Sequence, residues 1–190
     1  MPKDRLCAFM DAILAIIMTI LVLELEKPAE ASWAAFWALR SDFISYAVSF
    51  FWLGAMWINL HNRWVDVQRI DYSVLWWTII MLFFASFFPY VTSFVSEHFE
   101  SLFAQVLYST VAILVSFTNI CLSRAVINAN EVVGNALIST RYVVIADLVI
   151  KFCGIVLAFL VYPPCAMFGI VISGMVMTLA PIYLNKKNSQ

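Results

Sequence analysis

The sequence has few charged residues and few glycines for its length. Of its 190 residues only 12% are charged, whereas 64% are apolar. A soluble domain of this length cannot enclose so much apolar surface in one core, so the excess must face lipid. With only 5 glycines, and without a GxGxxG, Walker A, HExxH or GxSxG pattern, the sequence offers no phosphate-binding loop and no recognisable catalytic motif. We therefore expect a membrane protein that is not an enzyme.

Metal, redox and nucleic-acid chemistry also lack the residue patterns that they need. Cys7, Cys121, Cys153 and Cys165 are far apart and form neither a CxxC pair nor a Cys/His cluster, so we interpret them as packing residues. The formal net charge is −1, and lysine and arginine are scattered along the chain, which argues against a nucleic-acid partner. We expect no metal and no cofactor.

Six apolar runs have the length of a membrane-spanning helix, which needs about 20 residues to cross about 30 Å of hydrocarbon. They are Cys7 to Leu25, Phe43 to Leu60, Tyr72 to Val95, Leu102 to Val126, Tyr142 to Val161 and Cys165 to Leu184. The polar segments between them are short, which favours hairpin-linked helices. The sequence predicts an all-α polytopic membrane protein with a single six-helix domain over residues 1–190.

The first apolar run also has features of a signal peptide. Lys3 and Arg5 precede it, and a small-x-small pattern follows at positions 29–31. Asp11 would then lie at the start of the apolar region, and acidic residues would crowd the cleavage region. We therefore interpret this run as a retained helix.

Basic residues in the short connections predict the orientation, because cytoplasmic loops carry an excess of lysine and arginine. Only Lys27 and Arg40 fall on one side of a six-helix drawing, and Lys151 lies inside the fifth span. The opposite side holds Lys3, Arg5, Arg63, Arg69, Arg124, Arg141, Lys186 and Lys187. Both termini are therefore expected in the cytoplasm, in a multi-pass protein of the cell membrane.

Ionisable residues inside a membrane are costly and need a partner or a purpose. Asp11, near the start of the first span, is at the same membrane level as His61 and Asn59 if the first two spans form an antiparallel hairpin. A hydrogen bond from Asp11 to either residue could be a structural clamp or a latch sensitive to cytoplasmic pH. Asp147 and Lys151 are four residues apart and could neutralise each other, or relay a proton or substrate.

The first span carries a stripe of branched apolar residues. At about 100° per residue, Ile16, Ile20 and Leu23 fall within an arc of about 60°, with Thr19 at its margin and Asp11 on the far side. Such a stripe usually packs into a core. It could also line a pore.

Two motifs bear a resemblance to a known family. The stretch Arg5-x-x-x-Phe9-x-Asp11 is similar to R-x-x-x-F-S-D, with Met10 in place of the serine. Residues 57–63, Trp-Ile-Asn-Leu-His-Asn-Arg, are similar to W-x-N-H-H-R, with leucine in place of the first histidine. These are the motifs of the transmembrane protein 175 family of bacterial and lysosomal potassium channels. The match covers about the first third of the chain.

The resemblance implies a homotetramer of six-helix subunits in which the first helix of each subunit lines a central pore. It implies that Ile16, five residues after the motif aspartate, forms the narrow constriction, followed by Ile20 and Leu23, with Thr19 near the pore. It also implies that a set of motif residues ties the first helix to the second: Arg5, Phe9, Asp11, Trp57, Asn59 and His61. The family does not use a T-V-G-Y-G filter, and this sequence has none.

A fourfold stack of apolar rings would block ions by expelling water until the rings dilate. Glu24 and Glu26 at the outer end of the first span would raise the local cation concentration. We therefore expect a potassium-permeable channel that other monovalent cations could also enter. Two alternatives stay open: a small proton-coupled transporter built on Asp147 and Lys151, and a structural membrane subunit. A transporter of the common kinds would show internal repeats or a pair of glycine-broken helices, and the sequence shows neither.

Overall fold

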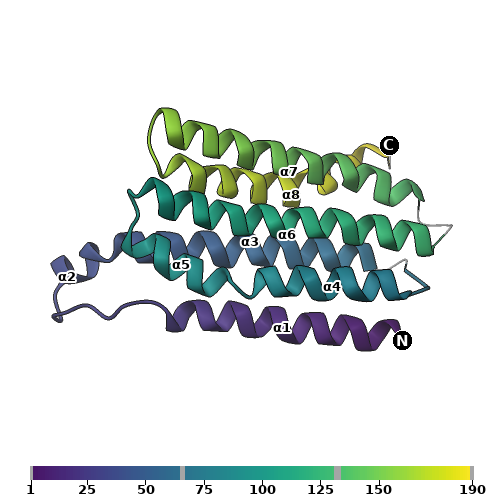
Figure 1. Ribbon diagram of the computed structural model, residues 1–190, viewed down its shortest axis with the longest axis horizontal. Coiled ribbons are helices and arrows are strands. Elements are labelled where there is room, and N and C mark those ends of the chain that lie inside the picture. The colour runs from purple at the N-terminus through teal and green to yellow at the C-terminus, as the bar shows by residue number, and fades with distance from the viewer. Residues whose placement is uncertain (1, 65–66, 131–133, 189–190) are drawn as a thin grey trace.

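The computed structural model describes residues 2–64, 67–130 and 134–188, and within these ranges every regular element is a helix. Long helices lie side by side and alternate in direction, so that the two chain ends lie at the same end of the bundle (Figure 1). We call this the N end and the opposite end the α2 end. The helices are α1 (Lys3–Leu23), α2 (Trp33–Ala38), α3 (Arg40–Trp64), α4 (Tyr72–Ala85), α5 (Phe88–Glu97), α6 (Leu102–Ala129), α7 (Gly134–Leu160) and α8 (Cys165–Asn188).

Four segments of the described chain are long and apolar enough to cross a membrane: Lys3–Leu23, Arg40–Trp64, Tyr72–Glu97 and Leu102–Ala129. They correspond to the first four predicted spans. The all-helical membrane fold predicted from the sequence is therefore confirmed. The fifth and sixth predicted spans lie in α7 and α8, which form an antiparallel pair beside α6 and α3 (Figure 1).

The third span is interrupted near its middle, between α4 and α5. Pro89 has no backbone N–H and cannot donate to the carbonyl four residues earlier, which breaks the helical ladder. Phe87 donates its N–H to the carbonyl of Phe84 at 3.2 Å, and the Ser86 hydroxyl donates to the carbonyl of Phe83 at 2.7 Å. The carbonyls of Phe83 and Phe84 next to the break are thus satisfied inside the same span, which lowers the cost of the break in lipid.

The short helix α2 was not expected, because six residues are too few to show a hydrophobic period. Ser32 starts this helix, and its hydroxyl accepts the N–H of Ala35 at 3.2 Å, a typical N-cap. Trp33 and Trp37 project from it and are exposed. Tryptophans in this position anchor a helix at the interface between lipid and water.

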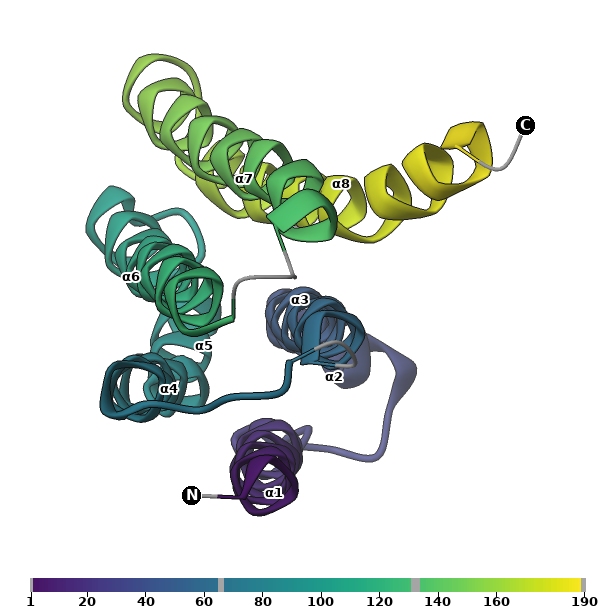
Figure 2. The same ribbon diagram turned by 90° about the vertical axis from the view of Figure 1, so that its right-hand side faces the viewer.

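Helix α1 lies at one edge of the bundle, and α7 and α8 lie on the opposite side of α3 (Figure 2). The face that α1 turns to α3, α4 and α5 repeats every three or four residues and is fully apolar: Leu6, Met10, Leu14, Ile17 and Leu21. Because this face holds α1 on the bundle, the remaining circumference of the helix is left outside the packing of the subunit.

Candidate functional site: the exposed face of α1

The side chains that were expected to line a pore lie on the outer face of α1 and are exposed in the single chain. The exposed fractions are 57% for Ile16, 36% for Ile20 and 78% for Leu23. Ile17, the next residue after Ile16, is only 3% exposed and belongs to the core. The stripe is therefore not core packing within the subunit, and the adjacent stripe that ends in Ile17 and Leu21 performs that role.

Thr19 lies on the same outer face and is exposed. Its hydroxyl donates to the carbonyl of Ile16 at 2.8 Å, within the helix. The donor is therefore occupied, while the lone pairs of the hydroxyl oxygen stay available to accept or to coordinate. This oxygen lies about one turn along the helix from the Ile16 side chain.

The first motif extends this face toward the N end. Phe9 is seven residues before Ile16, so it projects within about 20° of the same direction, and it is exposed. Arg5, four residues earlier, is also exposed. Glu24, which ends α1, and Glu26 beyond it are exposed at the other extremity of the face. Charged groups thus flank an apolar middle section.

Of the three α3 motif residues that the resemblance implied tie α1 to α3, Trp57 is the one that bonds to Asp11. The indole N–H of Trp57 donates to a carboxylate oxygen of Asp11 at 2.8 Å. The ring of His61 packs on that indole, with 5.6 Å between ring centroids. Asp11, Trp57 and His61 are all exposed in the single chain, so this contact lies at the surface of the subunit beside the outer face of α1.

Asn59 is buried and turned away from Asp11. Its amide donates to the carbonyl of Ala55 at 2.8 Å, and its own backbone carbonyl accepts from Arg63 at 3.2 Å. The Arg63 guanidinium then reaches α6, where it donates to Asn119 at 2.6 Å and to Ser123. The second motif therefore contacts α1 through Trp57 and contacts α6 through Arg63.

A second polar cluster lies far from α1, at the middle of α7. The Lys151 ammonium donates to Asp147 at 2.7 Å and to the Ser116 hydroxyl at 2.6 Å, and that hydroxyl donates to the same carboxylate oxygen at 2.6 Å. Both charged side chains are 0% exposed. The ammonium also lies 4.5 Å from the ring centroid of Trp52, a cation–π distance.

Spacing along one helix predicted the Asp147–Lys151 pair, but no pattern in the sequence pointed directly to Ser116 or Trp52. The available signal was the repeat of polar residues on α6 at Gln105, Ser109 and Ser116, all buried. Hydropathy treats these residues as tolerated exceptions in an apolar run. Their spacing places them on one face of α6, and the hydrogen bond from Ser116 to Asp147 shows that this face meets α7.

Comparison with known proteins shows which family the first part of the chain resembles. The model of the "Endosomal/lysosomal potassium channel TMEM175" family matches residues 5–89, which include the outer face of α1 and both motifs. A potassium channel of Chryseobacterium sp. (strain P1-3) is 40% identical over 100 residues, or 52% of this chain and 52% of the relative. Residues 5–89, somewhat less than half of the chain, thus resemble the TMEM175 family.

Two further potassium channels, from Streptomyces collinus and Chamaesiphon minutus, are 29% and 28% identical over 100 residues each. The matches span about half the length of these curated relatives: 52%, 48% and 49%.

The TMEM175 fold extends over the rest of the chain. The crystal structure of a lysosomal potassium-selective channel TMEM175 homolog from Chamaesiphon minutus superposes with a TM-score of 0.74. The superposition covers 99% of this chain and 98% of the other, at 20% sequence identity. At this identity the likeness establishes the fold, including the α7–α8 pair, which lies outside the family match over residues 5–89.

Proposed function

We propose that the chain is one subunit of a homotetrameric, potassium-permeable cation channel of the cell membrane, with α1 of each subunit lining a central pore. In this proposal residues 1–190 form a single domain of six transmembrane spans, with α4 and α5 together making the third, and both termini are cytoplasmic. The family match over residues 5–89 and the names of the curated relatives support potassium as the permeant ion.

The observation that carries the pore assignment is the contrast between neighbours on α1. Ile16 is 57% exposed and Ile17 is 3% exposed, so α1 buries one apolar face and leaves a second apolar face without an intramolecular partner. A pore needs such a face, and one helix cannot enclose a pore alone. Cyclic symmetry supplies the missing copies, because a closed ring brings the same face of each subunit to one axis.

The rings would act in the following way. Ile16, Ile20 and Leu23 are separated by four and three residues, so their rings stack over about 10 Å of pore length. A ring of branched apolar side chains excludes water when it is narrow, and ions then cannot pass. Ile16, the ring closest to the middle of α1, is assigned as the constriction, and the Thr19 hydroxyl is the nearest oxygen that could replace part of an ion's hydration shell.

The motif contacts serve a different purpose in this proposal. The Asp11–Trp57 hydrogen bond fixes the orientation of α1 on α3, so that Ile16 is held toward the axis. Arg5 and Phe9 continue the α1 face at the cytoplasmic entrance, Asn59 and His61 support Trp57 and Arg63 on α3, and Glu24 and Glu26 concentrate cations at the outer mouth.

Reconstitution into liposomes under a potassium gradient tests the proposal. The purified protein should support potassium flux far above that of protein-free liposomes, and Ile16→Asn should raise it because a polar ring holds water. Absence of flux from a folded, tetrameric preparation, together with no response to Ile16→Asn, would contradict the channel assignment.

A further inference from the structure

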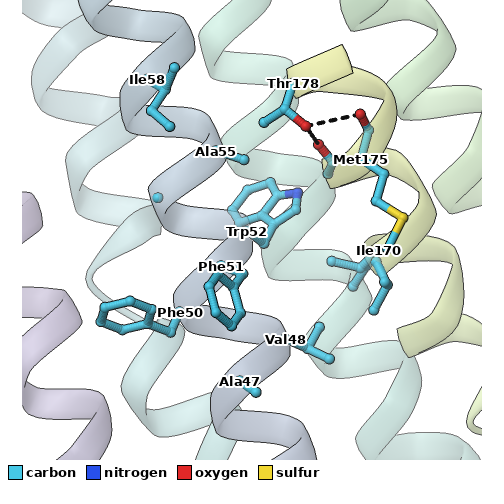
Figure 3. A pocket seen from close by; sticks show the side chains of 13 residues that line it. Ala47, Val48, Phe50, Phe51, Trp52, Ala55, Ile58, Ile170, Met175 and Thr178 are labelled. Atoms are coloured by element: carbon cyan, nitrogen blue, oxygen red, sulfur yellow. Dashed lines mark hydrogen bonds between the residues drawn. The ribbon is translucent and has the colours of Figure 1, made fainter. Parts of the chain in front are cut away.

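A groove of about 450 Å³ lies between α3 and α8. Figure 3 shows the side chains of both helices that form its walls. One of them, Trp52, is the midpoint of the membrane-spanning segment Arg40–Trp64, so the groove lies near the middle of the hydrocarbon layer. Helices α1 and α8 lie on different sides of α3 (Figure 2). The groove is therefore separate from the outer face of α1.

Small residues leave this space open between the two helices. Gly54 and Ala55 of α3 and Gly174 of α8 line the groove, and none of its lining residues is ionisable. The Thr178 hydroxyl, also in the lining, donates to carbonyls of its own helix at 3.0 and 3.1 Å. Exposed side chains such as Met175 leave the groove open to the outside of the subunit. Its interior is therefore apolar, with one exception.

The exception is the indole N–H of Trp52. This side chain is 3% exposed, and its N–H has no hydrogen-bond partner within the described part of the chain. Figure 3 shows the nitrogen on the side of the ring that is turned to α8, and the adjacent Cδ1 lies 3.3 Å from a Cβ placed at Gly174. The Lys151 ammonium and the Phe88 ring lie against the flat of the indole, 4.5 and 4.9 Å from its centroid. The N–H edge is thus left to donate into the groove.

An unpaired donor at this depth selects the chemistry of a ligand. Leaving the N–H unpaired in apolar surroundings costs free energy, and an acceptor removes that cost. The acyl tails of lipids have no acceptor near the bilayer midplane, because their ester oxygens lie at the interface. A charged group is costly at the same depth. The groove therefore fits a neutral, mostly apolar molecule with one acceptor oxygen, and its volume lies in the range of about 300–1,000 Å³ that is usual for small-molecule sites.

We propose that the groove between α3 and α8 binds a neutral, membrane-soluble ketone, whose carbonyl oxygen accepts the N–H of Trp52. The ligand enters from the lipid beside Met175, and its apolar body fills the space that Gly54, Ala55 and Gly174 leave open. When bound, it contacts both walls of the groove at once. The site goes beyond the proposed channel function and does not depend on it, because no residue of α1 lines the groove.

Benzophenone is a suitable probe, because it is a neutral ketone with an apolar body. Under ultraviolet light its carbonyl takes a hydrogen atom from a nearby C–H group, and the two carbon radicals then join, which leaves a covalently attached alcohol. The full chain is illuminated with benzophenone in liposomes, and the labelled positions are located by mass spectrometry. Labelling of Met175 should exceed that of Phe83, an exposed residue of α4 outside the groove, several-fold.

Competition on the unchanged protein tests the hydrogen bond. Fluorenone and fluorene have nearly the same shape, but only fluorenone carries a carbonyl oxygen. Fluorenone should protect Met175 from labelling at a several-fold lower concentration than fluorene. Equal protection by the two compounds would overturn the proposed hydrogen bond to Trp52, and labelling spread evenly over Met175 and Phe83 would show that the groove is ordinary lipid-facing surface.

Two variants and a matched control complete the test. Trp52→Phe keeps an aromatic ring but removes the N–H, and Ala55→Leu fills the groove while it keeps the N–H. Both should lower the labelling of Met175 several-fold, whereas Trp76→Phe, at an exposed tryptophan of α4, should leave it unchanged. Unchanged labelling in both groove variants would overturn the proposal. Labelling of Met175 in the dissociated subunit but not in the assembled protein would also overturn it, because a second copy of the chain would then fill the groove.

Discussion

Replacing Ile16 or Ile17 with alanine, one at a time, distinguishes a side chain that lines the pore from one that packs in the core. Ile17 is buried against the other helices, so Ile17→Ala leaves a cavity that costs about 2–5 kcal/mol. For a chain of this size this corresponds to a fall in melting temperature of roughly 4–20 °C. Ile16 is mostly exposed in the subunit, so Ile16→Ala should change subunit stability by only about 0.5 kcal/mol.

The effects on permeation should follow the opposite order. Ile16→Ala removes the widest part of each side chain from the proposed constriction, so cation flux should rise, and Ile16→Asn should raise it further because the ring becomes wet. If this ring contributes to ion selection, the asparagine variant also discriminates less between potassium and sodium. Flux per channel in Ile17→Ala should stay near that of the parent protein.

Reversal potentials in mixed potassium and sodium solutions, together with a thermal melt of the same preparation, provide both readouts. Val22→Ala is the control for exposure, because Val22 is exposed but projects about 120° away from Ile16. It should alter neither flux nor stability. Equal flux changes at positions 16 and 17, or none at either, would mean that the stripe packs against lipid or a partner and that the pore lies elsewhere.

Three further outcomes follow from the contacts. Asp11→Ala removes the acceptor of the Trp57 indole and should lower the yield of assembled protein, measured by size-exclusion chromatography, more than flux per channel; normal assembly with lost permeation would place Asp11 in the ion path. Lys151→Ala leaves the Asp147 carboxylate buried without its cation, which should cost about 3–5 kcal/mol in a thermal melt; an unchanged melting temperature would contradict a buried pair. Gly154→Val should separate α7 from α8, because a Cβ at this position lies 3.2 Å from a backbone atom of α8. Cysteine crosslinking between the two helices should then fail. Retained crosslinking would show that the two backbones can shift to accommodate the larger side chain.

Hydropathy was sufficient to locate the long helices, because each apolar run is far longer than a soluble core requires. It could not locate α2, which has only six residues. It also could not place the break between α4 and α5, since the residues around Pro89 are as apolar as the rest of the span. The break occurs because Pro89 lacks the backbone N–H that would continue the helical hydrogen bonds.

Hydrophobicity alone could not predict which face of α1 packs against the other helices. The helix has two apolar stripes, one through Ile17 and one through Ile16, and a lipid-spanning helix can bury either of them. Hydrophobicity does not distinguish a side chain in a core from one that faces lipid or a pore. Packing against α3, α4 and α5 buries the Ile17 stripe, and this contrast is the strongest structural support for the proposed pore.

Spacing along the chain also could not predict which residues of two different helices bond to each other. Membrane level alone pointed from Asp11 to His61 and Asn59, whereas the hydrogen bond goes to Trp57, one turn before His61 on α3. Only the motif resemblance had included Trp57 in the tie between the two helices. The Asp147–Lys151 pair was correctly anticipated because both residues lie on one helix, where the spacing is fixed. Ser116 joins them from α6, and the register between two helices is not encoded in the spacing along either one.

Accessibility of single cysteines during conduction tests the central claim most directly. The four native cysteines are free and can be replaced by alanine, after which Ile16→Cys, Ile20→Cys and Val22→Cys are made one at a time. A thiol-reactive cation of about the size of a hydrated potassium ion is then applied while current is recorded. The account predicts rapid block at positions 16 and 20 and no block at position 22. Conduction that persists unchanged after complete modification of positions 16 and 20 would show that α1 does not line the pore.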